Sequence, residues 1–159
     1  MYRLGLFLAA LWWGGLTALS FLAVPTLFAQ MGSPALAGPV AAKLFSLQAF
    51  AGLIIGLGLL VILRQERRRV VPELPDGLPE LPPAALWKVQ QALGTMAIVL
   101  LGMLLAMVQE FVVAEKIVMA RATGGDLRLW HGVGSGLVFA QWLCAAAVLW
   151  RLSGAHGRS

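Results

Sequence analysis

The stretch LFSLQAFAGLIIGLGLLVIL, residues 44–63, contains no charged side chain and is flanked by Lys43 and Arg64. A helix of about 20 apolar residues is long enough to cross roughly 30 Å of hydrocarbon. Three further stretches have the same character, at about residues 4–28, 89–109 and 129–150. The sequence therefore predicts an all-α, integral membrane four-helix bundle that forms a single domain over residues 1–159.

The composition supports this fold class. Hydrophobic residues make up 60% of the chain and charged residues 12%, whereas about 25% of the residues in a soluble domain are charged. The basic excess, 12 Lys+Arg against 7 Asp+Glu, lies in short segments between apolar runs. That distribution is typical of membrane topology signals and argues against nucleic acid as a partner. The single cysteine, Cys144, excludes an intrachain disulfide.

The first span resembles a secretory signal, because Arg3 precedes an apolar run. The apolar core of a signal is usually only about 7–15 residues long. This run is longer and contains Trp12 and Trp13 in its middle, so we expect a retained helix. Pro25 lacks an N–H group, which predicts a kink or a helix end near the outer boundary.

Orientation follows from the distribution of lysine and arginine, which concentrate on the cytoplasmic side. With the N-terminus inside, the inner side collects Arg3, Arg64, Arg67, Arg68, Arg69, Lys88, Arg151 and Arg158. The outer side collects the smaller set of Lys43, Lys116, Arg121 and Arg128. We therefore expect both termini in the cytoplasm and a multi-pass location in the bacterial inner membrane.

The outer connections carry helix signals. Ser33 and Pro34 form an N-cap followed by a first-turn proline, and the pair Gly38 and Pro39 is expected to interrupt that helix. After the third span the helix should continue along the interface and stop at residues 123–126, where two glycines occur.

The cytoplasmic linker, residues 64–88, has two halves. The first is a basic cluster made by Arg64, Arg67, Arg68 and Arg69. Such clusters set topology and attract anionic lipid headgroups. The second half repeats Pro-Glu-Leu-Pro, which predicts an extended hinge between two helical hairpins.

Small residues recur at close to helical spacing in every span and predict close helix packing. They are Gly14 and Ala18, Gly52 and Gly56, Gly94 and Gly102, and Gly132, Gly136 and Ala140. These faces could pack inside one bundle or form contacts in a homodimer or with another membrane protein.

Polar side chains gather at the outer ends of three spans. Lys43 opens the second span, Glu110 closes the third, and His131 opens the fourth with Ser135 on the same helix face. Gln109 is adjacent to Glu110, whereas Gln48 and Gln141 lie deeper in the spans. Ionisable residues in such places are candidates for function.

Three interpretations of this cluster stay open. Lys43 and Glu110 could form a structural ion pair, or the cluster could be the mouth of a polar cavity that binds a small solute or ion. A third makes His131 a metal or haem ligand assisted by Met103 and Met107. Methionine in apolar helices usually serves packing, so the sequence predicts no metal and no cofactor. Without a zinc-protease motif, a serine elbow or paired carboxylates, we expect no enzymatic activity.

Several short motifs recur in one order along the chain and resemble a known family. They are Gly15, Phe21 and Pro25-Thr26-Leu27-Phe28, Lys43-Leu44-Phe45, Trp87 and Gln90, and His131-Gly132-x-x-Ser135. The chain resembles the transmembrane protein 205-like family, known in bacteria as domain of unknown function 4149. That resemblance implies four spans, and the family's eukaryotic members are linked to platinum-drug resistance. It also marks Lys43, His131 and Ser135 as motif positions.

The sequence thus favours a membrane protein that binds or transports a small solute or metal species through an outward-facing polar site. The alternative is a structural or chaperone-like partner that contacts another membrane protein through glycine-lined helix faces.

Overall fold

The computed structural model describes residues 2–70 and 83–154, which are helical except at two short turns. The elements are α1 (Tyr2–Thr17), η1 (Ala18–Ala23), α2 (Val24–Met31), α3 (Pro34–Val70), α4 (Pro83–Val108), η2 (Gln109–Val113), α5 (Ala114–Thr123) and α6 (Leu127–Gly154). The segments η1 and η2 are π-helical turns, so α1, η1 and α2 form one rod, and α4, η2 and α5 form another.

Four helical rods are long and apolar enough to cross a membrane, as the sequence predicts. They are Arg3–Met31, Pro34–Arg69, Leu86–Thr123 and Leu127–Gly154. Large apolar side chains face outward along them; Ile54, for example, is 70% exposed. A surface of this kind is stable against lipid rather than water, so the fold is that of a multi-pass membrane protein.

The two hairpins share one order of elements. In each, a helix passes through a π-helical turn into a shorter helix and ends at a left-handed glycine, Gly32 (φ 64°) or Gly124 (φ 73°). A side-chain cap then starts the return helix. The Ser33 hydroxyl accepts the Ala35 N–H at 3.3 Å, and an Asp126 carboxylate oxygen accepts the Leu129 N–H at 2.9 Å. The predicted Ser33 cap and the predicted stop after Thr123 are both confirmed.

The second rod is longer than the sequence suggests. The predicted interruption at Gly38 and Pro39 is wrong, because α3 runs without a break from Pro34 to Val70. Pro39 lies near the start of the helix, where little helix precedes its ring. The basic half of the predicted linker is the last turns of α3, and Arg69 lies 3.8 Å from Glu66 there. Residues 71–82, which contain most of the predicted proline hinge, lie outside the described residues.

Pro25 does not end the first rod. The π-helical turn η1 precedes it, and the Val24 N–H bonds five residues back to the Leu19 carbonyl. A π-helical turn inserts one residue into the helix, a common device near functional sites. The rod then continues to Met31. The same geometry recurs in η2, where the Ala114 N–H bonds to the Gln109 carbonyl.

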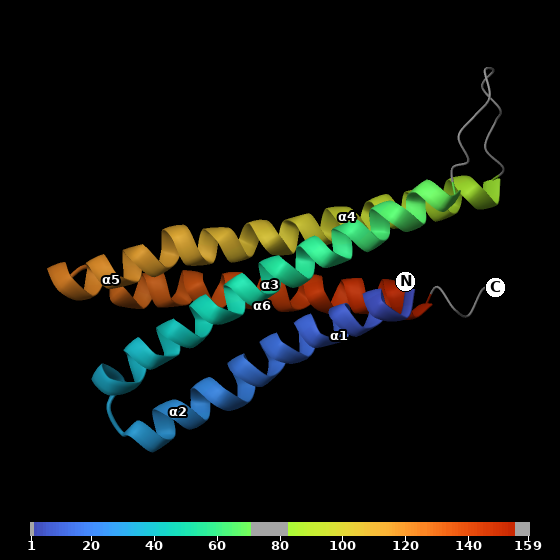
Figure 1. Cartoon of the computed structure of the whole chain (residues 1–159). Helices are drawn as coiled ribbons and strands as arrows, with labels where there is room; N and C mark the ends of the chain where they lie inside the picture. Colours follow the sequence, from blue (N-terminus) through green and yellow to red (C-terminus); the bar gives the residue numbers. More distant parts are fainter. Residues whose placement is uncertain (1, 71–82, 155–159) are drawn as a thin grey trace.

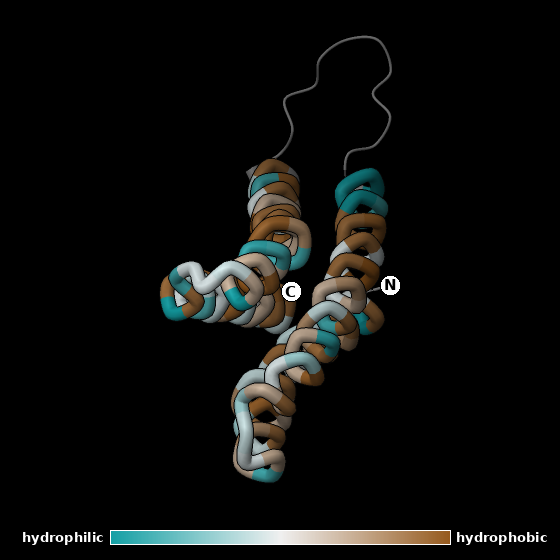
Figure 2. Tube along the Cα trace, turned by 90° about the vertical axis from the view of Figure 1, so that its left-hand side faces the viewer, coloured by the Kyte–Doolittle hydropathy of each residue, from teal (hydrophilic) through white to brown (hydrophobic). Residues whose placement is uncertain are grey.

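The hairpins are packed together at one end and diverge at the other (Figure 1). We call the end that holds the starts of α1 and α4 and the end of α6 the terminal end. The opposite end, which holds the α2–α3 and α5–α6 turns, is the turn end. Viewed along the bundle from the turn end, the two turns lie well apart (Figure 2).

The core lies where the four rods meet, and one indole occupies its centre. Trp12 of α1 is 1% exposed. A Cβ added at Gly102 of α4 would lie 2.7 Å from its ring, and one added at Gly52 of α3 would lie 3.1 Å from its Nε1. Because Gly52 and Gly102 have no side chains, there is space between the helices for this ring. Leu16, Leu59, Val99 and Val148 pack around it, each at most 2% exposed.

The glycine faces divide into two groups. Gly52, Gly56 and Gly102 lie in helix contacts, as the sequence predicts. The predicted contacts at Gly14 of the first span and at Gly132 and Gly136 of the fourth are wrong, because no described residue of another helix comes within 4 Å of a Cβ added there. The buried face of α6 is instead Gly134, Val138, Gln141, Cys144, Ala145 and Val148. Small residues occur on both faces of α6, so their spacing alone does not identify the packed one.

The contact with Trp12 predicts that alanine is tolerated less well at position 102 than at position 136. Gly102→Ala should lower the free energy of unfolding by about 1–3 kcal/mol, because the new methyl group meets a rigid, buried ring. Gly136→Ala is the matched control, since it adds the same methyl group in open space. Unfolding in mixed detergent micelles, followed by circular dichroism, measures both. Equal stability of the two variants would contradict the packing described here.

Candidate functional site

A pocket of about 740 Å³ lies between the two hairpins toward the turn end. Its walls come from η1 and α2, the first turns of α3, η2 and α5, and the first half of α6. Most of the lining side chains are apolar, including Val24, Ile117, Val118 and Val138. The pocket exists because the core packs the rods at the terminal end while the hairpins diverge beyond it.

Five of the seven predicted site residues line this pocket. They are Lys43, Gln109, Glu110, His131 and Ser135. Gln48 and Gln141 do not belong to its lining. Gln48 lies against Gly15, with its Oε1 3.2 Å from where a Cβ would stand, and Gln141 is 4% exposed in the packed face of α6.

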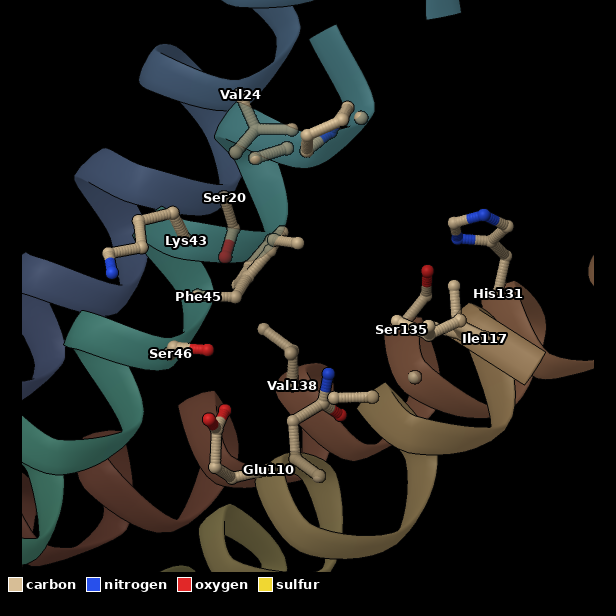
Figure 3. Close-up of a pocket in the computed structure, with 18 of the residues that line it drawn as sticks. Ser20, Val24, Lys43, Phe45, Ser46, Glu110, Ile117, His131, Ser135 and Val138 are labelled. Atoms are coloured by element: carbon tan, nitrogen blue, oxygen red, sulfur yellow. The ribbon is translucent and has the colours of Figure 1, made fainter. Parts of the chain in front are cut away.

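The charged residues do not form one cluster. Figure 3 shows Lys43 on the wall opposite His131 and Ser135, with its ammonium group directed away from them. Glu110 lies between these walls, at the floor of the pocket. The interpretation of Lys43 and Glu110 as an ion pair is wrong, because within residues 2–70 and 83–154 neither side chain forms an ion pair.

Polar groups from both π-helical turns reach the pocket. The Ser20 hydroxyl comes from η1, and the side chains of Gln109 and Glu110 come from η2. Ser20 Oγ and Gln109 Oε1 are buried and have no hydrogen-bond partner among the described residues. Buried polar atoms without partners are costly and uncommon in folded proteins. Both residues line the pocket, although these two oxygens are themselves closed off from it.

An aromatic wall, formed by Phe21, Phe139 and Trp142, lines one side of the pocket. Phe139 stacks on Trp142 at a centroid distance of 5.9 Å, and Phe21 meets Trp142 edge-on at 6.1 Å. The Trp142 indole N–H donates to the Thr17 hydroxyl at 2.9 Å. That hydroxyl donates in turn to the Trp13 carbonyl at 2.7 Å. The central ring of the wall is therefore held in one orientation.

Arg121 belongs to the rim of the pocket. Its guanidinium group extends from α5 to α3, where a Cβ added at Gly38 would lie 2.9 Å from one of its nitrogens. This contact bridges the two hairpins near the turn end. A side chain at position 38 would displace the arginine, so the glycine is needed for this close approach.

Sequence reasoning missed Ser20, Ser46 and Arg121 as lining residues. Pro25 was a usable signal for Ser20, since a proline inside a helix commonly requires a local change of hydrogen bonding in the preceding turn. No sequence signal of this kind identifies Ser46 or Arg121 as residues that line the pocket. Their place in the pocket depends on how the two hairpins are set against each other.

The metal interpretation gains no geometric support. In the described part of the chain no three His, Cys, Asp or Glu side chains lie close enough to hold a metal ion. Met103 packs against Gly56 in the core, and Met107 is 46% exposed. Neither methionine lines the pocket with His131.

The predicted headgroup-binding arginines lie far from the pocket. Arg64, Arg67, Arg68 and Arg69 occupy the end of α3 at the terminal end. Their role toward anionic lipid stays a prediction. The inner membrane location and the cytoplasmic placement of the termini likewise rest on the charge distribution alone.

Comparison with known proteins identifies the family. Residues 7–126 match a family described as a domain of unknown function (DUF4149). The match includes Lys43, Gln109 and Glu110 but ends before His131 and Ser135. No curated protein and no solved structure matches the chain. Because the match covers more than half of the sequence, the chain belongs to the DUF4149 family.

Proposed function

We propose that the chain is a multi-pass protein of the bacterial inner membrane that binds a small, largely apolar solute in the pocket between its hairpins. The observation that carries this proposal is the pocket itself. Its volume of about 740 Å³ lies within the range typical of small-molecule sites, which combine apolar walls with a few polar groups. Ser20, Gln109 and Glu110 are those polar groups here.

We propose that the protein binds the solute, and the proposal does not include its transport across the membrane. The pocket lies toward the turn end, whereas Trp12 and its neighbours fill the bundle toward the terminal end. Passage through the bundle would require the two hairpins to separate at that packed core. The proposal therefore commits to a binding site that is reached from the turn end, and the distribution of basic residues favours this end as the outer one.

A non-enzymatic role is part of the proposal. His131 and Ser135 both line the pocket and lie one turn apart on α6. Nucleophilic catalysis needs a hydrogen bond between nucleophile and base. Among the described residues no hydrogen bond joins this imidazole to this hydroxyl.

We also propose kinship with the transmembrane protein 205-like family, which the motifs around Pro25 and Lys43 support.

A role as a partner of another membrane protein rests on different residues. Gly52 and Gly56 contact Trp12 and Met103 of the same chain, so they are not free to receive a second protein. The open face at Gly132 and Gly136 is the remaining glycine-lined surface for such a contact or for a homodimer. Mutation there should leave solute binding unchanged, which separates the two roles.

The first test concerns access to the pocket from water. In a Cys144→Ala background, Ser46→Cys and Ser135→Cys should react with a membrane-impermeant maleimide in right-side-out vesicles. Both positions line the pocket. Ile54→Cys is the control, since that side chain faces outward from the middle of α3 and should lie in lipid. Labelling of Ser135→Cys only in inside-out vesicles would reverse the proposed orientation.

The second test concerns occupancy. Pyrene, a neutral and rigid aromatic solute, should slow the maleimide labelling of Ser46→Cys by at least about tenfold, because a bound molecule covers the floor of the pocket. Thr123→Cys serves as the control, since Thr123 is exposed at the end of α5 and does not line the pocket. If pyrene changes the labelling rate equally at both positions, the proposed solute site is wrong.

A further inference from the structure

The carboxylate of Glu110 is the one acidic group at the floor of the pocket. It is half-buried and, within the described residues, forms neither an ion pair nor a hydrogen bond. In Figure 3 its oxygens point toward Ser46, and the Lys43 ammonium group points elsewhere. A carboxylate that is partly withdrawn from water without a partner is destabilised. It gains most from a ligand that brings a positive charge.

The pocket that holds this carboxylate is also lined by aromatic rings. Phe21, Phe45 and Phe139 line the pocket together with Trp142 and Phe28. The face of an aromatic ring attracts cations, most strongly for tryptophan and when water is excluded. Trp142 is fixed by its hydrogen bond to Thr17 and by its ring contacts with Trp13, Phe21 and Phe139, so the wall needs little reordering when a ligand binds. An aromatic wall and a carboxylate that has no partner among the described residues, in one pocket, are a chemical combination suited to a hydrophobic cation.

The other ionisable residues of the pocket do not lie at its floor beside Glu110. Arg121 contacts Gly38 at the rim, Lys43 and His131 are exposed on opposite walls, and Glu115 lies on α5 with Arg121. Charges at an exposed rim are weakened by water and salt, whereas charges at a partly buried floor are weakened less. The floor therefore decides which charge a deeply bound ligand prefers.

Building on the proposed solute site, we infer that its ligands are hydrophobic organic cations. The positive centre lies beside the Glu110 carboxylate, and the apolar body packs against the aromatic wall. Anions of the same shape are disfavoured, because their charge would meet that of Glu110.

Two probes of nearly identical shape and opposite charge test this inference. Tetraphenylphosphonium and tetraphenylborate are titrated onto the full chain in lipid nanodiscs, and binding to empty nanodiscs is subtracted. The phosphonium should bind saturably at one site per chain. Glu110→Gln should weaken it by about tenfold or more, the loss of one close charge contact. The same substitution should leave borate binding unchanged or strengthen it.

Two further variants complete the experiment. Glu66→Gln removes an equal charge at the terminal end, where Glu66 contacts Arg69, and should leave phosphonium binding within about twofold. Phe139→Leu keeps an apolar side chain but removes a ring that is 54% exposed. It should weaken phosphonium binding several-fold and spare borate binding, which keeps the inference testable if Glu110→Gln does not fold.

The outcomes separate this inference from the proposed function. If pyrene protects Ser46→Cys but the phosphonium binds the wild-type chain and Glu110→Gln equally, the cation preference is overturned and the solute site stands. The same holds if borate binds more tightly than the phosphonium. If neither ion binds above empty nanodiscs, the inference is again overturned. A simultaneous failure of pyrene protection would then remove the solute site as well.

Discussion

The tight packing of the helical rods depends on the contact between the Trp12 indole and two glycines. The ring fills the space left by Gly52 of α3 and Gly102 of α4, so three rods meet around one side chain. In lipid the hydrophobic effect does not hold helices together, and close packing has to do so. The bundle is consequently tight where this ring lies, and the hairpins are free to diverge beyond it (Figure 1).

The pocket is a consequence of that divergence. Each hairpin contributes a π-helical turn at the depth where the bundle opens, and these turns direct Ser20 from η1 and Glu110 from η2 toward the opening. Each rod is helical along its length, so its backbone hydrogen bonds run within the rod, as a membrane requires. The side chains of the turns are less well satisfied, which makes this part of the protein suitable for ligand contacts while the core gives stability.

Sequence signals predict a helix start or stop correctly where the physical cause lies in a few neighbouring residues. The Ser33 cap and the stop at Gly124 depend on a few neighbouring residues, and both are present. The errors concern position relative to neighbouring elements. Pro39 was expected to break a helix, but it falls too near the helix start to do so. The pairing of Lys43 with Glu110 was inferred from similar depth, although depth does not determine which way a side chain points.

Four apolar helices, the places of their turns and the polar residues near the turn end can all be predicted from the sequence alone. Charge, apolar length and capping residues are sufficient for this, because each acts along one segment. The tertiary structure is needed to see that Gly134 rather than Gly136 faces the bundle, and that Glu110 has no partner among the described residues. Such features arise from the rotation and tilt of one helix against another, which are set by side-chain packing across the whole bundle.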